Sequence, residues 1–207
     1  MTHSNPSPQV ASPDWIERWQ QIARRIRVPL GFLTAALYLF DLTSRAPRPA
    51  AVASSLLLVI PGVWLRAYAA GYVKKNRELT STGPYAHTRN PLYLGSTLIA
   101  AGFALALLSW PVALLLTLFF FVIYVPVIAS EERFLRANFP EFALYCRRVP
   151  RLIPRLTPAP AISGSGNFSF QRYRQHREYN AAIGAALLYL CLLLLHPVAA
   201  ALLHRIP

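Results

Sequence analysis

The sequence predicts an all-α membrane protein, a polytopic bundle of about five transmembrane helices preceded by an interfacial helix. Of the 207 residues, 55% are hydrophobic and only 14% are charged, whereas a soluble domain has about 25% charged residues. The mean hydropathy is positive, at +0.36. Several apolar runs also approach the length of a spanning helix, which is roughly 20 residues. The lipid bilayer is therefore the solvent expected for this chain.

The N-terminal segment 1–27 is predicted to be an amphipathic helix on the membrane surface. Ser12 is a suitable N-cap, and Pro13 suits the first helical turn. Basic residues lie beside an apolar stripe with helical spacing, a pattern typical of interfacial helices. The start of the chain lacks the basic and apolar regions of a cleaved signal peptide, so the run that follows is expected to be a retained anchor. The stripe consists of Trp15, Ile16, Trp19, Ile22, Ala23 and Ile26.

Five apolar runs are predicted to cross the membrane within one domain, 28–207. The first run is short and spans only with help from the next two residues or a locally thin bilayer. A Pro/Gly/Ser-rich stretch lies in the predicted cytoplasmic loop 156–180, ahead of the last run. The runs are 28–40, 50–72, 92–108, 110–130 and 181–203.

The distribution of basic residues predicts the orientation of the chain. With five spans and a cytoplasmic N-terminus, 17 of the 21 Lys and Arg residues lie in the cytoplasmic pieces 1–27, 73–91 and 131–180. This asymmetry follows the positive-inside rule. It favours membrane lipids, and not nucleic acid, as the partner of a chain with a net charge of +13. The expected location is the bacterial inner membrane, or the endoplasmic reticulum in a eukaryote.

Two polar segments are predicted to meet at the cytoplasmic face. The sequence "LSWP" joins the third and fourth runs into a tight hairpin, so the segment 83–95 before the hairpin and the segment 131–155 after it emerge next to each other. In "GPYAHTRNPLYLG", a Gly-Pro turn is followed by Asn90 and Pro91, which begin a helix. Its free N–H groups and Arg89 make a corner that attracts anions. An interfacial belt of aromatic and basic anchors is the competing interpretation.

The second segment, "EERFLRANFPEFALYCRRVPRLIPR", places two adjacent carboxylates at the end of an apolar span. Acidic groups are costly there unless they have partners. Neighbouring helical residues point about 100° apart, so only one of Glu131 and Glu132 can face a given pocket squarely. A charged collar that solvates the end of the span is the competing interpretation.

Together the two segments closely resemble the membrane methyltransferases of the isoprenylcysteine carboxyl methyltransferase family, which are related to the phospholipid methyltransferases. The shared pattern is a Gly-Pro-Tyr turn, an Arg-x-Pro-x-Tyr-x-Gly helix start, a Glu-Glu pair and a Val-Pro-Arg ending. The resemblance covers about residues 50–155. It implies a cytoplasmic pocket for S-adenosylmethionine and a lipophilic or lipidated methyl acceptor that arrives from the membrane.

The resemblance also implies which residues form the site. Glu131 or Glu132 would meet the amino group or ribose of the cofactor, and Tyr145, Arg148 and Arg151 would close the pocket. The candidate catalytic residues are Arg89, Arg148 and Arg151, because a carboxylate acceptor would need a cationic partner such as one of these. The first wall of the cofactor pocket would be formed by Tyr85, His87, Arg89, Asn90, Pro91, Tyr93 and Gly95.

Two positions depart from the family pattern. Asn90 stands where histidine is usual; an amide can donate and accept hydrogen bonds but cannot titrate, which puts a proton shuttle there in doubt. Phe142 replaces a tyrosine and lacks its hydroxyl. Methyl transfer depends mainly on positioning. A basic site slightly favours a carboxylate over an amine acceptor.

Several alternatives stay open. The chain could be an NADPH-dependent membrane reductase of the sterol-reductase type, a phospholipid amine N-methyltransferase, or a non-enzymatic protein that keeps the pocket as structure. The segment 168–180 is either an interfacial helix or a lid, and Arg66 either snorkels or faces the site. Cys146 and Cys191 are expected to lie apart, without a disulfide. The histidines show no spacing typical of zinc, so no metal site is expected.

Overall fold

The computed structural model describes residues 14–74, 78–162 and 166–203. Three helices in these ranges are long and apolar enough to cross a membrane: Arg18–Ser44, Pro49–Tyr72 and Trp110–Asn138. Two shorter apolar helices, Pro91–Leu107 and Tyr179–Leu195, accompany them. Within the described ranges there is no strand. The predicted fold class, a polytopic all-α bundle, is confirmed.

The elements follow the predicted runs closely. The helix of the fourth run continues to Asn138 and contains a π-helical turn, η2, between α4 and α5. The described elements are α1 (Asp14–Ser44), α2 (Pro49–Tyr72), η1 (Gly83–Ala86), α3 (Pro91–Leu107), α4 (Trp110–Phe119), η2 (Phe120–Tyr124), α5 (Val125–Asn138), α6 (Phe142–Arg148), α7 (Phe170–Gln175) and α8 (Tyr179–Leu203).

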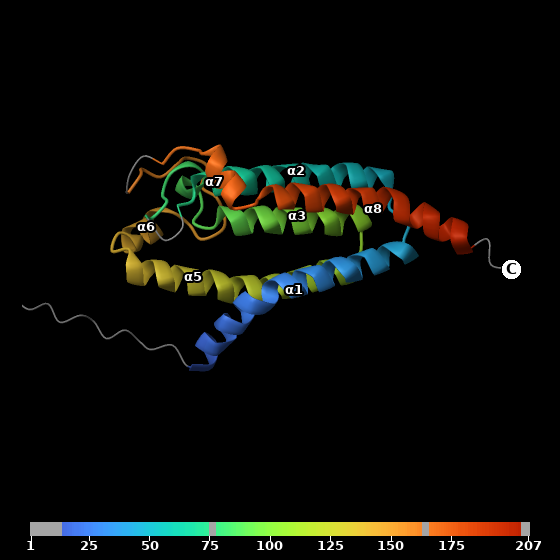
Figure 1. The fold of residues 1–207 in the computed structure, drawn as a ribbon, viewed down its shortest axis with the longest axis horizontal. Coiled ribbons are helices and arrows are strands. Elements are labelled where there is room, and N and C mark those ends of the chain that lie inside the picture. Colours follow the sequence, from blue (N-terminus) through green and yellow to red (C-terminus); the bar gives the residue numbers. More distant parts are fainter. Residues whose placement is uncertain (1–13, 75–77, 163–165, 204–207) are drawn as a thin grey trace, which may run out of the picture.

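The helices are arranged in two layers along the long axis of the molecule. Helices α2, α3 and α8 run side by side, and α1 and α5 form a second layer beside them (Figure 1). The short helices α6 and α7 and the loops around them gather at one end. The α1–α2 and α3–α4 connections lie at the opposite end. The hairpin prediction is thus confirmed, because the polar segments before α3 and after α5 meet at a single end of the bundle.

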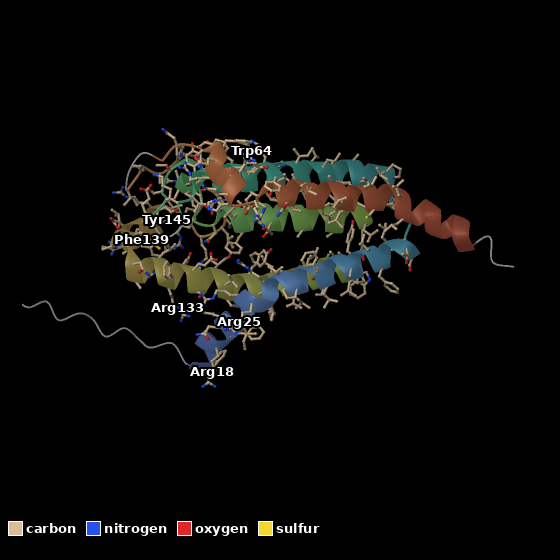
Figure 2. All side chains as sticks on the ribbon, in the orientation of Figure 1. Arg18, Arg25, Trp64, Arg133, Phe139 and Tyr145 are labelled. Atoms are coloured by element: carbon tan, nitrogen blue, oxygen red, sulfur yellow. The ribbon has the colours of Figure 1, made fainter. Side chains whose placement is uncertain are left out.

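The predicted interfacial helix and the first predicted span form one continuous helix, α1. Pro29 lies inside it, and the ribbon changes direction along its N-terminal half (Figure 1), as expected where proline removes a helical hydrogen bond. Part of the apolar stripe is used for packing: Ala23 is fully buried in a cluster with Ile123 and Val127. Arg18 and Arg25 project from the N-terminal part of α1 (Figure 2). The predicted N-cap at 12–13 lies outside the described residues.

Glycines bring α2 and α3 into close contact. A Cβ on Gly62 would lie 2.8 Å from the Gly95 carbonyl oxygen, and a Cβ on Gly95 would lie 2.7 Å from the Gly62 oxygen. Gly102 repeats this contact further along, with a Cβ position 3.0 Å from the Ser55 oxygen. Small residues commonly allow such close approach between membrane helices. This contact places the polar start of α3 against the last turns of α2.

A proline explains the π-helical turn η2. Pro126 has no N–H, and its ring clashes with the carbonyl four residues earlier, that of Val122. The helix accommodates this by widening over Phe120–Tyr124, and the indole N–H of Trp19 donates to the Val122 oxygen at 3.1 Å. The distortion thereby fixes α1 against the fourth span.

Candidate active site

A tight turn at the polar end of the bundle begins the site. Gly83 has a φ of +60°, and a Cβ there would lie 2.5 Å from the Tyr72 ring, so the turn requires glycine. A few residues later the backbone N–H of Arg89 donates to the Pro150 oxygen at 2.9 Å, and two further backbone bonds continue this pairing. The two motif segments are therefore joined along their backbones.

Glu132 of α5 is the centre of the polar cluster at this end. The residue is only 7% exposed. Arg151 donates to both carboxylate oxygens, with its Nη2 2.5 Å from Oε2 and its Nε 3.2 Å from Oε1. Nη1 of Arg89 lies 3.3 Å from Oε1, and Nδ2 of Asn90 donates to the same oxygen at 3.4 Å. Two guanidinium groups and an amide thus offset the cost of burying this carboxylate.

The Asn90 side chain binds within the cluster and does not cap the helix that Asn90 begins. It is the N-cap of α3 but makes no side-chain cap hydrogen bond; its Nδ2 also donates to the Arg151 carbonyl at 3.0 Å. Thr88 supports this arrangement. Its hydroxyl donates to the Arg151 carbonyl at 3.2 Å and accepts from the Asn90 N–H at 3.4 Å. Sequence reasoning missed Thr88, although a hydroxyl residue just before a helix start commonly binds nearby backbone.

The cluster has one more positive than negative charge and a spare donor. The hydrogen bond to Glu132 raises the pKa of Arg151. Nη1 of Arg89 also donates to the Cys146 sulfur at 2.7 Å, a contact that sequence reasoning did not anticipate. Nε of Arg89 is buried and has no hydrogen-bond partner among the described residues. Chemically, the cluster can bind a carboxylate through its guanidinium groups and an ammonium through Glu132.

The adjacent carboxylate, Glu131, belongs to a different network. The Tyr93 hydroxyl donates to Glu131 Oε1 at 2.8 Å, and Arg27 of α1 donates to the Tyr93 oxygen at 3.2 Å. Arg27 also lies 3.8 Å from the Glu131 carboxylate. The two adjacent carboxylates thus point in different directions, as the sequence predicted for neighbouring residues of a helix. Tyr93 and Glu131 link α1, α3 and α5, whereas Glu132 joins the two motif segments.

Two buried tyrosines, Tyr145 of α6 and Tyr85 of η1, connect these two elements. The Tyr145 hydroxyl donates to the Tyr85 carbonyl at 2.7 Å, and Tyr145 lies with Phe139 at the polar end of the bundle (Figure 2). Burial raises the pKa of both phenols. For Tyr85 the carboxylates of Glu131 and Glu178 add to this rise, and Arg66 opposes it. Tyr85 is therefore within electrostatic reach of Glu131 and of the charges on Arg66 and Glu178.

The remaining predicted site residues lie around the cluster. Nδ1 of His87 is 2.8 Å from the Arg155 carbonyl, so this ring joins the motif segments. Pro91 is buried in the first turn of α3, while Gly95 packs against α2. Arg148 is exposed and its carbonyl accepts from Arg155. Of the three arginines predicted to be catalytic, Arg89 and Arg151 converge on Glu132, and Arg148 does not.

A second polar group surrounds Arg66, which contacts the first turns of α3 and contributes to the lining of an apolar cavity. The cavity has a volume of about 310 Å³, and Arg66, Ser96 and Asn180 contribute to its lining. Arg66 therefore faces the protein interior. Its Nη2 lies 2.7 Å from Glu178 Oε2, and its Nη1 donates to the Leu92 carbonyl at 3.2 Å. An adjoining apolar cavity of about 520 Å³ shares part of this lining.

The described residues contain no group of three or more His, Cys, Asp or Glu side chains that could hold a metal ion.

The fold and the polar end define a multi-pass helical membrane protein with a buried, cationic site at one end. The motif resemblance is confirmed by a comparison with known families: residues 52–141 match the model of the phospholipid methyltransferase family. This segment includes Arg89, Asn90 and Glu132. It stops before Arg151, the fourth member of the cluster.

Two curated bacterial proteins are similar to this chain. The cobalt-zinc-cadmium resistance protein CzcN of Cupriavidus metallidurans is 40% identical over 101 residues, which cover 49% of this chain and 46% of that protein. The nickel-cobalt-cadmium resistance protein NccN of Alcaligenes xylosoxydans xylosoxydans is 40% identical over 95 residues, or 46% of this chain and 44% of that protein. The chain thus matches about half the length of these relatives. No solved structure matches it.

Proposed function

We propose that this protein is an S-adenosylmethionine-dependent methyltransferase, similar to the isoprenylcysteine carboxyl methyltransferases. Its acceptor is a lipophilic or lipidated molecule, with a carboxylate in preference to an amine. The single observation that carries this proposal is the convergence of Arg89, Asn90 and Arg151 on the buried carboxylate of Glu132. The match of residues 52–141 to a methyltransferase family supports the same reaction class.

The residues of the cluster fit the amino-acid end of S-adenosylmethionine, which has one carboxylate and one ammonium group. Arg89 has a buried Nε–H that no described residue accepts, and with Arg151 it would hold the carboxylate. Glu132 would accept from the ammonium group. The cofactor supplies a methyl group on a positively charged sulfur, and the chain's own residues supply orientation and exclusion of water. Asn90 keeps Glu132 in place without needing to titrate.

The acceptor is proposed to enter from the lipid. The two apolar cavities lie among the spanning helices, and the first one ends at Arg66, one turn along α3 from the cluster. In-line transfer to a carboxylate needs only a cation that holds the acceptor. An amine acceptor would first have to lose a proton. The cationic character of this end therefore supports a carboxylate.

The site is proposed to face the cytoplasm of a bacterial cell, in an inner-membrane protein. The positive-inside distribution supports this orientation, because 17 of the 21 Lys and Arg residues, Arg89 and Arg151 among them, lie in the segments predicted to be cytoplasmic.

Equilibrium binding to the purified full-length protein in nanodiscs tests the proposal directly. S-adenosylmethionine should bind and NADPH should not. Glu132→Gln removes a charge-assisted hydrogen bond worth about 1.5–3 kcal/mol, so the affinity for S-adenosylmethionine should fall roughly ten- to a hundredfold. Glu131→Gln is the matched control and should change it less than about threefold, since Glu131 serves Tyr93 and Arg27.

Thermal unfolding of both variants separates a binding effect from a loss of fold. If both variants fold and bind S-adenosylmethionine as tightly as the parent, the Glu132 cluster is a structural collar and the proposal fails. Preferential binding of NADPH would instead support the membrane reductase.

A further inference from the structure

Arg66, which contributes to the lining of the first cavity, forms a partly buried ion pair with Glu178. The Arg66 side chain is 23% exposed and the Glu178 side chain 14% exposed, and their closest atoms are 2.7 Å apart. Arg66 is anchored on the first turns of α3, where it donates to the Leu92 carbonyl and to the Ser96 hydroxyl. Charged groups in a membrane segment are costly unless they are paired, so Glu178 compensates for the burial of Arg66.

The pairing leaves part of the guanidinium unused. Glu178 contacts Nη2 only, through a single oxygen. Nε of Arg66 is buried and lacks a hydrogen-bond partner among the described residues. Carboxylates commonly bind arginine through two parallel hydrogen bonds. A free carboxylate that took both Nε and Nη2 would therefore gain one hydrogen bond over the internal contact.

Glu178 reaches Arg66 from a separate, short segment. It lies between α7 and α8, directly after Arg177, which has a φ of +53°. This left-handed conformation is uncommon for a residue with a side chain. Helix α7 is fixed to the C-terminal end of α2, because Nδ1 of His176 lies 3.0 Å from the Ala70 carbonyl and Nε of Arg172 donates to the Gly71 carbonyl at 2.8 Å. The turn after α7 is what places Glu178 beside Arg66.

The rest of the cavity suits an apolar chain. Ile99, Phe103, Val112 and Leu188 line it away from Arg66. An amphiphile whose chain filled this space would bring its head group to Arg66. That position is one helical turn from Asn90 and the Glu132 cluster.

We propose that Arg66 binds the anionic head of an amphiphilic acceptor whose chain occupies this cavity, and that Glu178 is an internal carboxylate which this head displaces. Arg66 is then a positioning residue for the acceptor, and Glu178 is the internal partner that pairs with Arg66 until an acceptor arrives. The role as acceptor site rests on the proposed methyltransferase function. Binding of an anionic amphiphile does not, so the two can be tested separately.

The experiment uses the full-length protein in phosphatidylcholine nanodiscs, with radiolabelled dodecanoate and dodecanol as probes of equal chain length. The parent protein should bind dodecanoate more tightly than dodecanol. Glu178→Gln removes the competing carboxylate and should tighten dodecanoate binding about three- to tenfold without changing dodecanol binding. Glu141→Gln removes a charge from an exposed position and should leave both affinities unchanged.

A double variant keeps the test valid if an unpaired Arg66 or Glu178 disturbs folding. Arg66→Met combined with Glu178→Gln leaves no buried charge without a partner. It should bind dodecanoate no better than dodecanol and retain the parent's affinity for dodecanol. If the double variant still prefers dodecanoate, or if Glu178→Gln leaves dodecanoate binding unchanged, the proposal is overturned.

A zwitterionic probe tests the alternative in which Glu178 also holds the head group, because Glu178→Gln would then weaken binding of the probe. If dodecylphosphoethanolamine binds the parent more tightly than dodecanoate and Glu178→Gln weakens it, both charges hold the head group and displacement of Glu178 is disproved. S-adenosylmethionine binding is measured on the same samples. If the protein prefers dodecanoate, and more so in Glu178→Gln, but does not bind S-adenosylmethionine, only the methyltransferase function is refuted. If it binds S-adenosylmethionine but lacks this preference for dodecanoate, only the role of Arg66 and Glu178 is refuted.

Discussion

At the scale of single residues, direction on a helix separates two carboxylates that are adjacent in sequence. Glu132 turns toward Arg89 and Arg151, whereas Glu131 turns toward Tyr93 and Arg27. Successive residues on an α-helix differ by about 100° in direction, so the pair cannot serve one ligand together. The charges of the polar end are thus divided between a buried cluster and a network that ties three helices together.

Substitution of Asn90 tests how much the binding of S-adenosylmethionine depends on an amide at this position. Asn90→His should change the affinity for S-adenosylmethionine by less than about tenfold, or roughly 1.4 kcal/mol, because an imidazole N–H can also donate to Glu132. Isothermal titration of the purified variant measures this.

Asn90→Leu is the matched control for that substitution. It removes the donor to Glu132 and to the Arg151 carbonyl and should weaken binding more than histidine does. A complete loss of binding in Asn90→His with an intact fold would mean that the pocket is adapted to asparagine alone.

At the scale of elements, glycines set the distance between α2 and α3, and this distance positions the site. Gly62 and Gly95 place the two backbones in direct contact. The first turns of α3, which follow the N-cap Asn90, also accept a hydrogen bond from Arg66. The π-helical turn before Pro126 has a comparable role on the other side, where Trp19 fixes α1 against the fourth span. The first contact depends on the close approach of two glycine backbones, and the second on a backbone carbonyl that accepts a hydrogen bond from the Trp19 side chain.

Adding one methyl group at this contact should loosen it. In Gly95→Ala the new Cβ would lie 2.7 Å from Cγ of Arg66 and 2.7 Å from the Gly62 oxygen. Overpacking of this kind costs about 1–3 kcal/mol, so the midpoint of thermal unfolding in detergent should fall.

Gly184→Ala in α8 provides the matched control. Nothing lies within 4 Å of its Cβ position, and alanine is the better helix former. Its unfolding midpoint should stay the same or rise. Equal destabilisation by the two substitutions would show that α2 and α3 are not in close contact.

At the scale of the whole molecule, the bundle has a polar end and an apolar body. The segments that carry Arg89, Glu132, Arg151 and Glu178 all reach the same end (Figure 1). The opposite end has the short connections between the spans. A single orientation in the membrane therefore decides which side of the cell the whole site faces.

Cysteine labelling of intact cells checks this orientation. With Cys146 and Cys191 replaced by serine, a membrane-impermeant maleimide should label Ser44→Cys from outside and should not label Ala161→Cys until the cells are opened. Both positions are exposed. The reverse pattern would place the site outside the cytoplasm and contradict the positive-inside prediction.

The sequence by itself determined the solvent, the helices and most members of the site. Apolar length and composition predicted the spanning bundle, and the short connection after α3 brought the two polar motifs to one end. Arg89 and Asn90 could be named because their motif lies at a predicted helix start, and Arg151 because it belongs to the Val-Pro-Arg ending of the second segment. Their contacts with Glu132 follow from that hairpin, although Asn90 and Glu132 are 42 positions apart in the sequence.

Only the tertiary structure decided which side chains meet across distant segments. Glu178 lies 112 positions from Arg66, and its contact depends on the docking of α7 at the end of α2. The continuity of α1 and the widening at η2 likewise depend on packing between helices, through Pro29, Pro126 and Trp19. Hydrophobic periodicity describes one helix at a time, whereas pairing of buried charges depends on which helix faces become neighbours.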